Sequence, residues 1–139
     1  MDSILIILVV SVLIIAGMLM LFINLTSTNK QKLDVETYRK VWQAIKRSSE
    51  SDNLDAMQMS IVKADKLLDK AMCESNVKGS TMGERLRFRK GMWSNENAVW
   101  ASHKLRNQIA HDDNISLNKQ TVKRAMAGFE RALKDLGAL

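Results

Sequence analysis

The stretch from Ile4 to Ile23 limits the possible folds of this chain more than any other feature. Its residues are all apolar except Ser11 and Gly17, and no charge interrupts them. At the rise of an α-helix this length spans roughly 30 Å, the thickness of the hydrocarbon layer of a bilayer. A helix satisfies its backbone hydrogen bonds internally, so the run predicts a transmembrane helix. We therefore expect a membrane anchor over residues 1–25.

A cleaved signal peptide is the competing interpretation of the same run. Such a peptide begins with basic residues, has a shorter apolar stretch and ends at a small-residue cleavage site. This chain begins with Met1 and Asp2, and no A-x-A pattern follows the apolar run. We therefore favour a permanent anchor.

Basic residues on the flanks predict the orientation of this anchor. No Lys or Arg precedes the run, whereas Lys30 and Lys32 follow it closely. The positive-inside rule then places the N-terminus outside and the rest of the chain in the cytoplasm. We expect a single-pass protein, with membrane lipid around the anchor and a short polar linker over residues 26–33. An unprocessed anchor of this orientation suits a bacterial plasma (inner) membrane.

The part after the anchor is strongly basic. All 21 Lys and Arg lie in it against 14 of the 15 acidic residues, which gives it a formal net charge of +7. Such an excess favours an anionic partner, either lipid headgroups of the inner leaflet, nucleic acid or both. The single cysteine, Cys73, excludes an intramolecular disulfide, and we expect it to be a small buried hydrophobic residue.

Residues 34–139 read as helical throughout, because proline is absent and apolar residues recur at spacings of three and four. Polar residues before each apolar stripe predict the helix starts, and these expected N-caps are Asp34, Asp52, Thr81, Ser94 and either Ser116 or Asn118. Thr81 and Glu84 also fit a capping box, and Gly137 fits a C-terminal cap. The sequence thus predicts an all-α fold, in which one transmembrane helix precedes a bundle of four or five helices.

The segment RNQIAH, residues 106–111, carries the candidate chemistry. On a helix His103, Asn107 and His111 share one face, and Arg106 lies beside it. One interpretation of this stripe is the polar end of an ordinary helix, with His111 near the negative end of the helix dipole. A metal site is disfavoured, since two histidines eight residues apart lie about 12 Å apart along the axis. A third interpretation is RNA cleavage, which needs a proton-transfer group such as His and a cation such as Arg.

The same residues resemble a known motif. Arg106 to His111 is similar to the R-x(4–6)-H motif of HEPN domains, including the frequent Asn after the Arg. The surroundings are similar as well, because the motif lies on a late helix of a small helical bundle. The resemblance covers about residues 34–139 and leaves out the anchor.

This resemblance implies metal-independent RNA cleavage without a cofactor. It implies that His111 transfers the proton, that Arg106 stabilises the phosphate and that Asn107 orients them. Many such domains form homodimers in which two motif faces meet, so we expect a homodimer and an RNA substrate. Some members of the superfamily bind nucleotides or proteins without cutting. A non-catalytic adaptor that holds an unknown protein partner at the membrane therefore remains the alternative function.

The segment RLRFRK, residues 85–90, is the second candidate site. Its cations, Arg85, Arg87, Arg89 and Lys90, flank Phe88 and suggest a nucleic-acid-binding patch with a stacking residue. We favour the simpler interpretation, in which the charges form a solvated helix surface and the apolar residues face the core. Contact with lipid headgroups is a third possible use.

Overall fold

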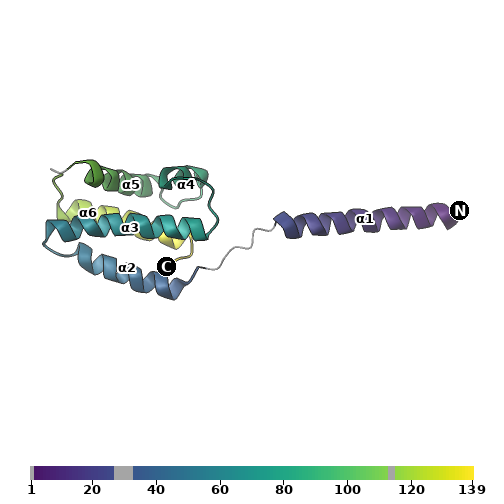
Figure 1. Ribbon diagram of the computed structural model, residues 1–139, viewed down its shortest axis with the longest axis horizontal. Helices are drawn as coiled ribbons and strands as arrows, with labels where there is room; N and C mark the ends of the chain where they lie inside the picture. The colour runs from purple at the N-terminus through teal and green to yellow at the C-terminus, as the bar shows by residue number, and fades with distance from the viewer. Residues whose placement is uncertain (1, 27–32, 113–114) are drawn as a thin grey trace. The chain divides into compact units, whose positions relative to one another are not determined.

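The computed structural model describes residues 2–26, 33–112 and 115–139. Over these residues the chain is all-helical, without strands, as the sequence predicts. The helices run in the order α1 (Asp2–Thr26), α2 (Val35–Ser49), α3 (Leu54–Glu74), α4 (Met82–Phe88), α5 (Glu96–His111) and α6 (Lys119–Asp135). The chain divides into two compact units, residues 1–30 and 31–139 (Figure 1). Most of the predicted linker, residues 27–32, lies outside the described residues.

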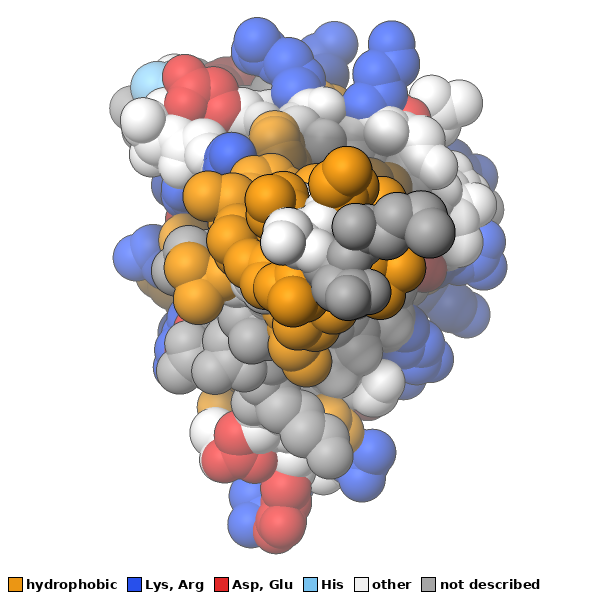
Figure 2. All heavy atoms as spheres, turned by 90° about the vertical axis from the view of Figure 1, so that its right-hand side faces the viewer, with side chains coloured by type: hydrophobic (Ala, Val, Ile, Leu, Met, Phe, Trp, Pro, Cys, Tyr) orange, Lys and Arg blue, Asp and Glu red, His pale blue; other side chains and the backbone are white. Residues whose placement is uncertain are grey.

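Helix α1 is long and apolar enough to cross a membrane from Ser3 to Ile23, and its most apolar window is not buried against protein. A view along its axis shows hydrophobic side chains on nearly every side (Figure 2). A helix that is apolar all round needs an apolar environment on all sides. The apolar surface of α1 is therefore compatible with a helix that crosses a membrane.

The second unit is a bundle in which α3 and α6 lie between α2 and α5 (Figure 1). Helix α4 packs against α3. The core consists of apolar residues at the expected helical spacing, and its largest fully buried side chains are Phe129, Ile61, Leu68, Met72, Leu86 and Leu133. One face of α3 therefore contacts α5, and the candidate functional site lies at this contact.

Hydrogen bonds from the helix N-termini identify the caps. The side chains of Asp34, Thr81 and Asn118 accept the bonds that the sequence predicts. The predicted caps Asp52 and Ser94 are wrong by one residue, because Asn53 and Asn95 accept the corresponding bonds. Gly137 has a φ of 74°, so it ends α6 in the left-handed conformation expected of a C-terminal glycine.

Cys73 corrects a further expectation. It is exposed on α3 rather than buried. The apolar stripe of α3 passes through Leu68, Ala71 and Met72, and residue 73 falls beyond its edge. The position of Cys73 on the helix, rather than the hydrophobic character of its side chain, therefore decides its exposure.

Candidate functional site

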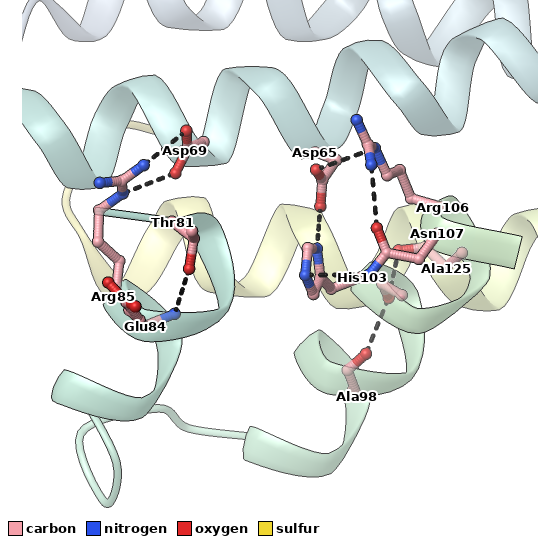
Figure 3. Close-up of polar contacts among 11 residues, drawn as sticks. Asp65, Asp69, Thr81, Glu84, Arg85, Ala98, His103, Arg106, Asn107 and Ala125 are labelled. Carbon is pink, nitrogen blue, oxygen red and sulfur yellow. Dashed lines mark hydrogen bonds and ion pairs between the residues drawn. The ribbon is translucent and has the colours of Figure 1, made fainter. Parts of the chain in front are cut away.

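Four polar residues join α3 to α5, and we call them the polar cluster: Asp65, His103, Arg106 and Asn107 (Figure 3). The Nδ1 atom of His103 lies 2.8 Å from Oδ1 of Asp65, and Nε of Arg106 lies 3.5 Å from the second carboxylate oxygen. Arg106 donates through Nη1 to Oδ1 of Asn107 at 2.9 Å. The Nδ2 atom of Asn107 lies 3.3 Å from Nε2 of His103. The four side chains thus form a closed ring of contacts.

Helix geometry explains how α5 supplies three members of this ring. His103, Arg106 and Asn107 are spaced by three and four residues, so they project from one side of α5. Asp65 meets them from α3, where it is only 4% exposed. A carboxylate so deeply buried needs charged or hydrogen-bonding partners, and His103 and Arg106 provide them.

The partners of the His103 ring assign its hydrogens. Asp65 accepts a hydrogen bond from Nδ1–H, which leaves Nε2 as the acceptor for the amide of Asn107. A carboxylate that accepts from Nδ1–H fixes the orientation and the tautomer of an imidazole. His103 is therefore held in one orientation, with the lone pair of Nε2 directed at the amide of Asn107.

The polar cluster borders a polar cavity of about 460 Å³ that is open to solvent. Residues of α3, α5 and the start of α4 line it, including Lys66, Thr81, Met82 and Gly83. A Cβ atom on Gly83 would lie 3.9 Å from Nε2 of His103, so this glycine borders the imidazole closely. The side chains of His103 and Arg106 are 12% and 30% exposed, respectively. The cavity therefore gives a ligand access to both an imidazole and a guanidinium.

The structure brings two of the three predicted catalytic residues together. Arg106 and Asn107 are hydrogen-bonded members of the polar cluster. His111 is exposed at the last residue of α5 and does not line the cavity. His103 occupies the place beside Arg106 and Asn107 instead. Spacing along α5 places His103 on this face, but nothing in the sequence pairs it with Asp65, which lies 38 residues earlier.

The predicted basic patch is divided between the inside and the outside of the domain. Arg85 is buried, donates to both oxygens of Asp69 at 2.7 and 3.0 Å, and also donates to the carbonyl of Gly79. Hydrogen bonding to Asp69 raises the pKa of Arg85. This arginine therefore joins α4 to α3 and does not belong to an exposed surface.

The other three cations of this segment differ in exposure. Arg87 and Lys90 are exposed, whereas Arg89 is half-buried with its guanidinium 5.0 Å from the centre of the Trp93 ring. Phe88 is 54% exposed rather than part of the core. The exposed part of the segment therefore offers two cations and one aromatic ring.

No metal site is visible in the described part of the chain. Within residues 2–26, 33–112 and 115–139, no three His, Cys, Asp or Glu residues are grouped so that they could hold a metal ion. The polar cluster contains one carboxylate and one imidazole, together with a guanidinium that would repel a cation. Two carboxylates, Asp65 and Asp69, and two cations, Lys66 and Arg106, line the cavity, so its net charge favours neither an anion nor a cation.

Fold and site together define a broad class. It is a helical domain with a polar cluster between its α3 and its penultimate helix, and in the sequence this domain follows one apolar helix that could span a membrane. The chain matches no protein-family model, no curated protein and no solved structure. The function is therefore inferred from the chemistry of the residues.

Proposed function

We propose that residues 34–139 form a metal-independent endoribonuclease domain, held at the cytoplasmic face of a bacterial plasma membrane by α1. The observation that carries the proposal is the polar cluster, in which Arg106 and His103 border one open polar cavity. The HEPN-like motif on the same helix, which shares Arg106 and Asn107 with the polar cluster, is a further reason for it.

The chemistry of RNA cleavage matches the groups in this site. The 2′-oxygen bonds to phosphorus and loses its proton to a base, while the bond from phosphorus to the 5′-oxygen breaks and an acid protonates the leaving oxygen. An imidazole is the side chain that exchanges protons near neutral pH. Two imidazoles, His103 and His111, lie on α5. Arg106 stabilises the charge that grows on the phosphate oxygens, and Asn107 orients the guanidinium.

A homodimer is part of this proposal. His111 stands at the exposed end of α5, so a second copy of the chain that meets this end would bring another motif to the same substrate. A shared site would use Arg106 of one protomer and an imidazole of either. Arg87 and Lys90 are exposed and provide further contacts for the RNA backbone.

An experiment with the full chain in detergent tests the proposal. Labelled RNA is incubated with the protein in EDTA, and DNA of the same sequence serves as the control. The proposal predicts cut RNA and intact DNA, because the reaction uses the 2′-oxygen. Absence of both RNA cleavage and RNA binding would lead us to the alternative function.

That alternative is a membrane-tethered adaptor, and a specific surface favours it. A shallow groove of about 660 Å³ runs along α5 and α6 and is lined mainly by apolar atoms, including those of Ala98, Ala101, Leu105 and Gly128. Exposed apolar surface of this kind suits docking of a protein partner. Substitution of Ala101 by Arg would then abolish capture of the partner and leave any RNA cleavage unchanged.

A further inference from the structure

A second groove, between α2 and α3, combines an apolar floor with a row of lysines. Its volume is about 480 Å³, and its floor is formed by Val41, Ala44, Ile45 and Leu67. Lys63, Lys66 and Lys70 line the groove from α3. None of the described residues that line it is acidic. We call this feature the lysine groove.

The three lysines of the groove project from one side of α3. Their spacing of three and four residues places them on neighbouring turns of the same face. Lys70 lies 3.7 Å from Glu74, which partly offsets its charge. Lys63 and Lys66 are exposed and make no ion pair with any described residue. Most of the positive charge is therefore available to a ligand.

We propose that the lysine groove binds the headgroups of anionic phospholipids. An ammonium group is a compact charge that suits phosphate, and the aliphatic floor suits the glycerol and the first methylene groups of the acyl chains. Single-stranded nucleic acid fits less well, because its bases stack on aromatic side chains and the floor has none.

The anchor on the same chain favours lipid over other amphipathic ligands. Eight residues, 27–34, separate α1 from α2. When α1 spans a bilayer, this short connection keeps the lipid headgroups at a high effective concentration for α2 and α3. An acidic amphipathic helix from another protein has similar chemistry but no such advantage. This inference does not depend on the ribonuclease proposal.

Cys73 provides the probe for a test. It is the only cysteine of the chain and is exposed. It follows Lys66 by seven residues and Lys70 by three, so it lies on the same side of α3. An environment-sensitive fluorophore on Cys73 of the full chain would report the docking of this face onto lipid.

The labelled chain is reconstituted into vesicles of phosphatidylcholine alone and into vesicles that also contain phosphatidylglycerol. We expect a blue shift of the emission only with phosphatidylglycerol. The triple variant Lys63→Gln/Lys66→Gln/Lys70→Gln should lower the ratio of docked to undocked chains on the order of 100-fold. The matched variant Lys78→Gln/Lys104→Gln/Lys123→Gln removes the same charge from exposed positions elsewhere and should keep the shift.

Two results would overturn the inference. Equal emission in the two kinds of vesicle would show that anionic lipid is not the occupant, and would favour an acidic protein helix. Equal loss of the blue shift in both triple variants would show that net charge, rather than the groove, attracts the domain.

Discussion

At the scale of single residues, Asp65 matters most for the site, because its buried carboxylate contacts both His103 and Arg106. Replacement by Ala removes the acceptor and leaves a guanidinium and an imidazole without their shared partner. We expect Asp65→Ala to lower the free energy of unfolding by about 3 kcal/mol. Urea unfolding of residues 31–139 measures it, with the exposed Asp55→Ala as the control. Equal stability of both variants would mean that the cluster does not hold α3 to α5.

The two imidazoles give a second prediction at this scale. If the cavity is the site of cleavage, His103→Gln should slow RNA cleavage by about 100-fold or more, because it removes a positioned proton-transfer group. His111→Gln tests the residue that the HEPN resemblance implies, and a loss of the same size there would indicate a shared site in a dimer. Lys104→Gln, an exposed neighbour on α5, is the control. If His103→Gln cleaves RNA at the parent rate while His111→Gln is slow, the site of cleavage lies outside the cavity.

Sequence reasoning recovers this site only in part. The spacing along α5 is enough to place His103, Arg106 and Asn107 on one side, because helix geometry fixes it. The pairing with Asp65 depends on how α3 packs against α5, and no local pattern encodes that. Arg85 shows the same limit, since its inward turn depends on Asp69 of another helix.

At the scale of elements, α5 and α6 approach each other closely at Gly128. A Cβ atom there would overlap Oγ of Ser102 and would lie 2.7 Å from the carbonyl oxygen of Ala98. Gly128→Ala should therefore lower the free energy of unfolding by about 2 kcal/mol, although alanine favours helices. Thermal unfolding checks this, with Lys123→Ala on the exposed face of α6 as the control. A more stable Gly128→Ala variant would contradict the close packing.

Glu130 on α6 makes the stability of the fold depend on pH. A hydrogen bond from Lys134 lowers its pKa below the ordinary value of 4.5, despite partial burial, and Lys46 of α2 adds to this effect. A carboxyl group with a lowered pKa stabilises the fold above pH 4.5 and loses this contribution as the pH falls through its folded value. Glu130→Gln should thus weaken the pH dependence of stability below pH 4.5, by less than about 1 kcal/mol. Identical curves of stability against pH for the parent chain and for Glu130→Gln would contradict this prediction.

Helix positions follow closely from the sequence, whereas their ends do not. The apolar stripes place the helices, because burial of one face decides where a helix forms. Two adjacent polar residues can each cap a helix, and the local sequence does not decide between them, as at Asp52 and Asn53. Helix α5 has few fully buried residues, and its Ala101 and Leu105 border the exposed groove.

At the scale of the whole molecule, the orientation of the chain in the membrane can be measured with Cys73. The proposal places this exposed cysteine in the cytoplasm. A membrane-impermeant maleimide should therefore label it in inverted vesicles and not in intact cells. Labelling in intact cells would show the opposite orientation, in which the domain does not meet cytoplasmic RNA.

The central claim is that the polar cluster is a site of RNA cleavage. Its most direct test is the initial rate of RNA cleavage in EDTA by the parent chain and by Arg106→Ala, with circular dichroism to confirm that the variant is folded. We predict that the parent cleaves and that the variant is slower by at least about 100-fold, because it lacks the cation that stabilises the phosphate. Equal rates, or no cleavage by the parent, would contradict the account.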